Sequence, residues 1–145
     1  MISFINNNSN TRVADKTKIK QWIEQECVRH NKQLGEISII LCGDNEILET
    51  NITYLQHHYL TDIITFNYNE ENTISGDLYL GMTTIKENAQ TYQVKLQEEI
   101  KRVIIHGILH LLGFNDKTES EQHTMTKMEN ECLQNYKQMF HVKQS

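Results

Sequence analysis

The stretch from His106 to Asp116, "HGILHLLGFND", sets two histidines four residues apart, followed by a glycine and an aspartate at steps of three. Residues four apart lie one above the other on the same face of a helix, so His106 and His110 can reach a common point. Gly113 stops the helix and lets the chain turn back, which can bring Asp116 to that point from the side. The pattern H-x-x-x-H-x-x-G-x-x-D therefore predicts a helix that carries metal ligands at its C-terminal end.

Two neutral imidazoles and one carboxylate form a ligand set that suits Zn²⁺, with a fourth position left open for water. An open position is typical of catalytic zinc, which lowers the pKa of water and polarises a substrate oxygen. Paired histidines also occur on helices without a metal, but the glycine turn and Asp116 favour one Zn²⁺ per chain. His123 is the alternative third ligand. The other histidines are expected outside the site: His30, His57, His58 and His141.

The residue after the first histidine, Gly107, is unusual for a zinc helix of this spacing. The spacing resembles that of the metzincin zinc peptidases, which carry a glutamate at this position as the general base. Glycine inside a helix costs about 0.5–1 kcal/mol relative to alanine, so either close packing or open space requires it here. We expect Gly107 to leave room beside the metal for a bulky anionic group such as a phosphodiester. It is therefore a candidate substrate-binding residue.

Helices and short apolar strands alternate along the rest of the chain. Strands are expected at residues 2–5, 37–42, 62–68 and 77–81, the last two joined through a polar turn at 69–76. Helices are expected at residues 16–31, 45–55 and 97–112. Thr84 and Glu87 form a capping box that predicts a further short helix, and Thr118 and Glu121 form one that opens a last helix ending at about Phe140. This order predicts one α+β domain over residues 1–145, with a mostly four-stranded mixed sheet packed with helices.

Composition narrows the class of protein further. The chain has 145 residues and a net charge of −5, which argues against a protein that coats nucleic acid through a general basic surface. The N-terminus "MISFINNNSN" is unlike a signal peptide, and no apolar run approaches the roughly 18 residues of a membrane helix, so a cytoplasmic location is expected. Cys27, Cys42 and Cys132 are expected to be buried thiols in a reducing compartment.

Several segments together resemble the YbeY-type family of bacterial rRNA maturation factors. The histidine motif looks like the family's H-G-x-L-H-L-x-G-Y-D-H, and the segments "DNEILETNITYL" (44–55), "LTDIITFNY" (60–68) and "GDLYLG" (76–81) are similar to its upstream segments. The resemblance implies a cytoplasmic, zinc-dependent, single-strand-specific endoribonuclease that matures the 3′ end of 16S rRNA and acts in ribosome quality control. It further implies a zincin-like α+β fold and the metal ligands His106, His110 and Asp116. The implied partners are rRNA, the small ribosomal subunit and a ribosomal protein, with no DNA and no membrane.

This chain departs from the family pattern at three places. Asp116 stands where the family usually has a third histidine, which should leave the bound water less acidic and favour harder ions. Leu55 stands where the family has an arginine that is thought to meet RNA phosphate. Phe114 and Asn115 replace the usual Tyr-Asp, which removes one carboxylate near the site.

Arg102 is the candidate replacement for the missing phosphate contact. It lies one turn before His106 on the same helix face, and it is a candidate substrate-binding residue. The alternative, which the spacing favours, is that Arg102 pairs with Glu98 or Glu99 on a solvated surface.

No side chain of the motif is an evident general base for phosphodiester hydrolysis. Asp77 and the pair Thr61 and Asp62 lie at strand ends and are candidate helpers, although a local structural role is the more common one for such residues. Two other functions stay open. The protein could be a ribosome-assembly binding factor with a structural or vestigial zinc site, which the negative charge and the missing arginine favour, or a small metal-dependent hydrolase of another substrate.

Overall fold

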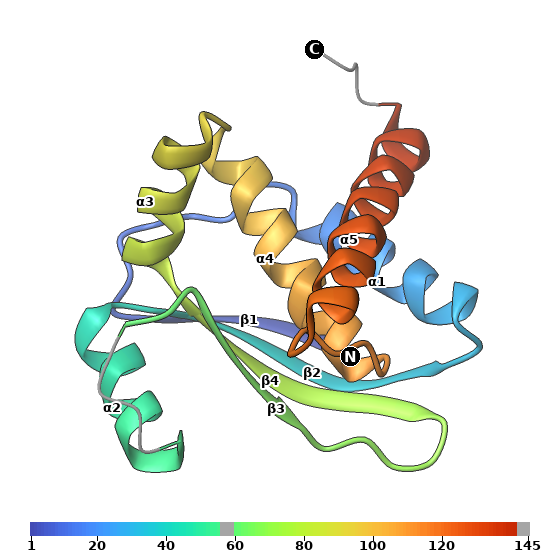
Figure 1. Ribbon diagram of the computed structural model, residues 1–145, viewed down its shortest axis with the longest axis horizontal. Helices are drawn as coiled ribbons and strands as arrows, with labels where there is room; N and C mark the ends of the chain where they lie inside the picture. The colour runs from blue at the N-terminus through green and yellow to red at the C-terminus, as the bar shows by residue number, and fades with distance from the viewer. Residues whose placement is uncertain (56–59, 142–145) are drawn as a thin grey trace.

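A four-stranded mixed sheet forms the base of the molecule (Figure 1). The computed structural model describes residues 1–55 and 60–141. In space the strands follow the order β1-β2-β4-β3, with β1 (Ile2–Asn7), β2 (Gln33–Cys42) and β4 (Thr73–Gly81) parallel to one another. The edge strand β3 (Ile63–Asn67) runs antiparallel to β4. The mixed sheet and the α+β class confirm the prediction from the sequence.

Among the described residues, four helices gather over one face of this sheet and a fifth lies against the other face (Figure 1). The four are α1 (Lys16–Arg29), α3 (Met82–Tyr92), α4 (Leu96–Leu111) and α5 (Glu119–Phe140). The helix on the opposite face is α2 (Asp44–Leu55), where Ile47 packs against Ile40 and Ile64 of the sheet. Helix α4 packs directly on β3 and β4, and α5 covers α4 and α1.

Helix α4 is the central helix of the main core. Most of its circumference is buried, as Ile104, Ile105 and Ile108 show, because the sheet, α3 and α5 surround it. A stripe at four-residue spacing stays partly exposed, and it carries Arg102, His106 and His110. From Arg102 onward, the polar side chains of α4 therefore reach solvent along a single line, which ends at the helix C-terminus.

The β3–β4 hairpin is tighter than the predicted turn at 69–76. Strand β4 already begins at Thr73, and the backbone groups of Glu70 and Thr73 exchange hydrogen bonds of 3.1 and 2.9 Å. The prediction of a polar turn is wrong from Thr73 onward. Ile74 and Gly76 are buried, and they belong to the alternation of buried and partly exposed residues along β4.

One of the two predicted capping boxes is present. Thr118 and Glu121 cap α5, with the Glu121 N–H donating to Thr118 Oγ1 at 3.1 Å and the Thr118 N–H donating to Glu121 Oε1 at 3.0 Å. The box at Thr84 and Glu87 is wrong, because α3 starts earlier, with Gly81 as its N-cap and no side-chain cap.

The three cysteines are buried and free, as predicted. Burial raises the pKa of the Cys27 and Cys42 thiols to about 11, so these groups are protonated and unreactive at neutral pH. None of the described helices is long and apolar enough to cross a membrane.

Candidate metal centre and active-site cleft

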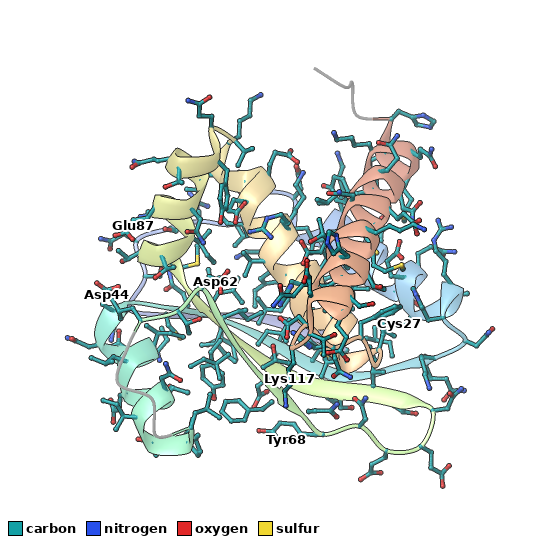
Figure 2. The ribbon with its side chains drawn as sticks, in the orientation of Figure 1. Cys27, Asp44, Asp62, Tyr68, Glu87 and Lys117 are labelled. Carbon is teal, nitrogen blue, oxygen red and sulfur yellow. The ribbon has the colours of Figure 1, made fainter. Side chains whose placement is uncertain are left out.

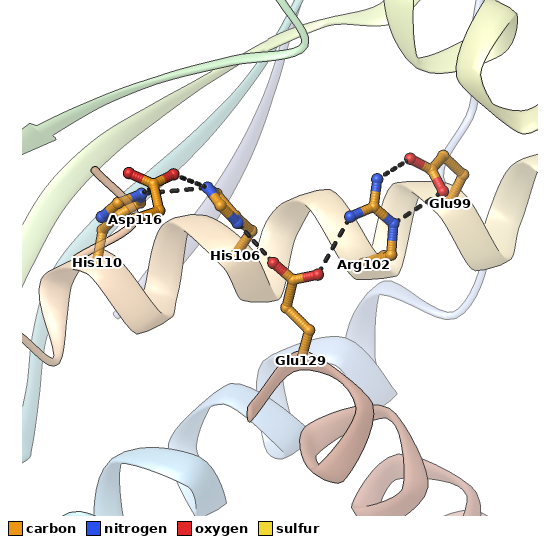
Figure 3. Close-up of polar contacts among 6 residues, drawn as sticks. All are labelled: Glu99, Arg102, His106, His110, Asp116 and Glu129. Atoms are coloured by element: carbon orange, nitrogen blue, oxygen red, sulfur yellow. Dashed lines mark hydrogen bonds and ion pairs between the residues drawn. The ribbon is translucent and has the colours of Figure 1, made fainter. Parts of the chain in front are cut away.

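The turn after α4 brings the three predicted metal ligands together. Gly113 has a φ of +108°, its N–H donates to the His110 carbonyl at 3.0 Å, and the Phe114 N–H donates to the Leu109 carbonyl at 3.0 Å. These two bonds form a Schellman motif, which requires glycine at this place because L side chains rarely adopt such a φ. The chain reverses after this turn, and Asp116 returns over the last turn of the helix (Figure 3).

The three ligand atoms form a nearly equilateral triangle. His106 Nε2 and His110 Nε2 are 3.1 Å apart, and Asp116 Oδ2 lies 3.3 Å from each of them. A tetrahedral Zn²⁺ ion with ligands at about 2.0–2.1 Å places those ligands about 3.3 Å from one another. The triangle therefore fits one face of a tetrahedral metal site. The side chains are 21%, 27% and 38% exposed, which leaves the fourth position open to solvent.

The other ring nitrogen of His106 contacts a buried carboxylate of α5. His106 Nδ1 lies 2.6 Å from Glu129 Oε2 (Figure 3), and Nδ1–H can donate to this carboxylate while Nε2 keeps its lone pair for a metal. Burial by itself lowers the pKa of His106. The hydrogen bond and negative charge of Glu129, together with Asp116 and Asp62, outweigh burial and raise that pKa above its ordinary value of 6.5.

Glu129 is the site residue that sequence reasoning missed. It is 5% exposed and lies on the buried stripe of α5, four residues after Met125 and three before Cys132. A glutamate at a core position of an amphipathic helix was the available signal, because a buried carboxylate needs a charged or hydrogen-bonding partner.

Arg102 is held by two buried carboxylates. Its Nε donates to Glu99 Oε1 at 3.0 Å, its Nη2 pairs with Glu99 Oε2, and its Nη1 donates to Glu129 Oε1 at 3.1 Å. The hydrogen bonds to Glu99 are the main reason that the pKa of Arg102 lies well above its ordinary value. The predicted pairing with Glu99 is confirmed, although Glu99 is buried rather than solvated. These bonds use three of the five guanidinium N–H groups, and Arg102 also lines a hollow beside His106, so the phosphate contact stays a prediction.

Gly107 faces the sheet, and the prediction that it opens space beside the metal is wrong. A Cβ atom at this position would lie 2.8 Å from Ile63 Cδ1 and 2.9 Å from Leu78 Cδ2. The glycine is therefore required by the close packing of α4 on β3 and β4. Its spacing from Ile104 and Leu111 on the buried stripe was a sequence signal for this orientation.

An open cleft of about 480 Å³ lies over the triangle of ligand atoms. One wall is β3 with the residues that lead into it, and the other is the C-terminal end of α4 with Asp116. Leu55, which replaces the family's arginine, lines this cleft. A second hollow of about 290 Å³ shares His106, Asp116 and Asp62 with the cleft and continues toward α5. The two hollows meet at the candidate metal centre.

The predicted helper residues lie in different places. Asp62, which immediately precedes β3 (Figure 2), lines both hollows, and Thr61 Oγ1 lies 3.5 Å from its carboxylate. Asp77 is absent from the described residues that line the cleft. It accepts a hydrogen bond of 3.2 Å from the hydroxyl of Tyr68, which lies on the side of the sheet away from α4 and α5 (Figure 2). The structure therefore brings Asp62 to the site and leaves Asp77 outside it.

The remaining histidines do not join the ligand triangle where the structure describes them. His123, the alternative third ligand, is exposed on α5 and lines a different hollow. His30 packs edge-on against Phe114, with ring centroids 5.7 Å apart, and His141 is exposed. His57 and His58 lie outside the described residues.

Comparison with known proteins agrees with this geometry. The family model described as Endoribonuclease YbeY matches residues 4–137. A relative of that name from Parabacteroides distasonis is 48% identical over 81% of this chain and 83% of its own, and one from Flavobacterium psychrophilum is 40% identical over the full length of both chains. The solution structure of TM1509 from Thermotoga maritima matches with a TM-score of 0.69 and 25% identity, over 97% of this chain and 92% of that one.

The family match over most of the chain, together with the α+β fold, places the protein in the endoribonuclease class of enzymes. The chain belongs to the Endoribonuclease YbeY family. The family and the class of activity predicted from the sequence are therefore confirmed. A group of three side chains that could hold a metal ion is also present, with all ligand atoms within 4.8 Å of one another.

Proposed function

We propose that the protein processes ribosomal RNA as a single-strand-specific endoribonuclease, with one Zn²⁺ ion held by His106, His110 and Asp116. The observation that carries this proposal is the triangle of ligand atoms, with sides of 3.1 and 3.3 Å, at the meeting point of two hollows. A divalent ion bound there would lower the pKa of a water ligand and polarise a phosphoryl oxygen of the substrate.

The side chains of the cleft supply the rest of the chemistry. Asp62 lies in both hollows, so its carboxylate is placed to accept a proton or to orient a water molecule beside the scissile phosphate. Asp116 contributes a negative charge where a third histidine would be neutral. This charge would leave a metal-bound water less acidic than in a three-histidine site and would shift the metal preference toward harder ions.

The shape of the site suits a flexible strand of RNA. The two hollows continue on either side of His106, so the nucleotides before and after the scissile phosphate each have space beside the metal. The proposed substrate is the 3′ end of 16S rRNA, and the proposed partners are the small ribosomal subunit and a ribosomal protein. The proposed location is the cytoplasm, where these partners are found.

A second candidate function is a ribosome-assembly factor that binds rRNA without cutting it. The net charge of −5 and Leu55 in the cleft favour this function, because both weaken the attraction of the site for phosphate.

RNA cleavage separates the two functions. We expect the protein to cut a single-stranded fragment of the 16S rRNA 3′ region, to lose this activity in chelator, and to regain it when Zn²⁺ is added. His110→Ala should abolish cleavage, while His123→Ala, which removes an exposed histidine outside the triangle, should not. Cleavage that survives both chelator and His110→Ala contradicts the proposal. Binding of the small subunit by the wild type and by His110→Ala, without cleavage by either, establishes the binding factor instead.

A further inference from the structure

A row of four interacting side chains runs along α4 and α5 away from the metal centre (Figure 3). We call Glu99, Arg102, Glu129 and His106 the buried relay. Glu99 holds Arg102, Arg102 Nη1 donates to Glu129 Oε1 at 3.1 Å, and Glu129 Oε2 lies 2.6 Å from His106 Nδ1. Each carboxylate of the relay uses both of its oxygens, so every charged group in it has a partner.

We propose that Glu129 is a positioning residue for the metal centre, and that Arg102, clamped by Glu99, keeps Glu129 in place. In this arrangement Glu129 accepts the Nδ1 proton of His106, which fixes both the tautomer and the ring orientation that direct Nε2 at the metal. The inference deepens the proposed function by assigning the groups that orient its metal ligand. It gives Arg102 a structural role in the site, separate from the predicted phosphate contact.

The burial of the relay supports a functional role. Glu99 and Glu129 are 2% and 5% exposed, and removing carboxylates from water costs free energy that an ion pair only partly returns. The neighbouring buried positions of α5 carry Met125, Cys132 and Tyr136, so the helix packs with apolar residues elsewhere on this stripe. A buried ion pair is weak evidence of a gain in stability. The orientation of His106 accounts for the presence of the buried Arg102–Glu129 ion pair at this one turn of the helix.

The charges of the relay also suit a cation. Glu99, Glu129, the ligand Asp116 and the neighbouring Asp62 carry four negative charges, and Arg102 carries one positive charge. The excess of negative charge favours a cation in the triangle.

Metal affinity measures the role of Glu129 directly. In Glu129→Gln the amide keeps the size of the side chain but removes its charge and leaves Arg102 with one carboxylate. We expect the affinity for Zn²⁺, measured by competition with a chromophoric chelator, to fall roughly 10–100-fold. Arg102→Gln should weaken affinity in the same direction by a smaller factor.

The matched control is Glu26→Gln. Glu26 is also a buried glutamate facing α5, 1% exposed and bonded to Asn135 and Cys132, but it is outside the metal centre. This variant should bind Zn²⁺ as the wild type does. Unchanged affinity in folded Glu129→Gln, or an equal loss in Glu26→Gln, contradicts the inference.

Nitrogen-15 NMR of the histidine rings tests the same inference in the wild type, so it decides the matter even where Glu129→Gln does not fold. In the Zn²⁺-loaded protein we expect the proton of His106 on Nδ1, with a low-field hydrogen-bonded resonance that moves to higher field in folded Glu129→Gln, because an amide oxygen accepts more weakly than a carboxylate. A proton on Nε2, or Nδ1 bound to the metal, overturns the inference. Neither readout depends on RNA. A protein that binds Zn²⁺ with the expected ring state but cuts no RNA therefore contradicts the proposed function and leaves the positioning role intact.

Discussion

In the metal centre, the two polar atoms of one side chain can have different partners. His106 is the clearest case, because its Nε2 belongs to the ligand triangle while its Nδ1 meets Glu129. The same carboxylate that orients the ring also favours its protonated form, so proton and metal compete for one imidazole. The positions of His106, His110 and Asp116 were predictable from their spacing, since a helix and a glycine turn are local structures. The pattern of α5 could have marked Glu129 as a buried carboxylate, but its contact with His106 was not predictable, because only the packing of α5 on α4 brings it to the ring.

The pH dependence of metal binding follows from this competition. Glu129 and Asp116 raise the pKa of His106 above 6.5, so its protonated form persists to a higher pH than in an ordinary histidine. Zn²⁺ affinity should therefore be full above this raised pKa and fall as the pH decreases through it. The metal-free protein should behave in the opposite sense. The stability that it gains from protonated His106 is complete below 6.5 and is lost as the pH rises through the raised pKa.

Chelator competition measured across about pH 5 to 8, where histidines titrate, tests this prediction. His123→Ala serves as the control and should give the wild-type profile, because His123 lies outside the ligand triangle. A Zn²⁺ affinity that begins to fall only below pH 6.5 would show that the pKa of His106 is not raised.

At the scale of secondary structure, the C-terminal end of α4 decides whether the ligands meet. Sequence periodicity predicted this helix and its stop at Gly113, and the structure confirms both to within one residue. It did not establish which face of the helix Gly107 occupies, although the buried stripe contained that information. The burial of Glu99 could not be read from local spacing, because it depends on the elements that pack around α4.

Replacement of Gly113 should damage both the fold and the metal centre. A side chain at a φ of +108° is strained, so Gly113→Ala should lower the free energy of unfolding by about 1–3 kcal/mol. It should also weaken Zn²⁺ binding, because the strained turn no longer returns Asp116 to the helix end. Denaturant unfolding and chelator competition measure the two effects, with Lys117→Ala, an exposed change in the same segment, as the control. Wild-type metal affinity in Gly113→Ala would mean that the turn does not position Asp116.

At the scale of the whole molecule, the cleft forms because the edge strand β3 and helix α4 lie side by side at the border of the sheet. The sequence predicted the strands, the hairpin and the class of fold. It did not predict the order β1-β2-β4-β3, because pairing between β2 and β4 joins segments that are far apart in the chain. Beyond the match over residues 4–137, the extension of one domain across residues 1–145 stays a prediction.

Metal binding should stabilise the whole molecule, because the ligands join α4 to the segment that enters α5. At a free Zn²⁺ concentration 100 times the dissociation constant, linkage gives about 2.7 kcal/mol, or a rise in Tm of about 5–10 °C for a chain of this size. Calorimetry with chelator and with Zn²⁺ measures the difference. His110→Ala should show little of this rise, and an equal rise in that variant would place the bound zinc elsewhere.

The metal content of the purified protein tests the central claim most directly, when it is measured by plasma mass spectrometry beside that of Asp116→Ala. The geometry of the ligand triangle predicts about one zinc per chain in the wild type, and little or none in the variant. No bound metal in the wild type, or zinc that is unaffected by the loss of Asp116, would contradict the three-ligand site on which the proposed endoribonuclease mechanism depends.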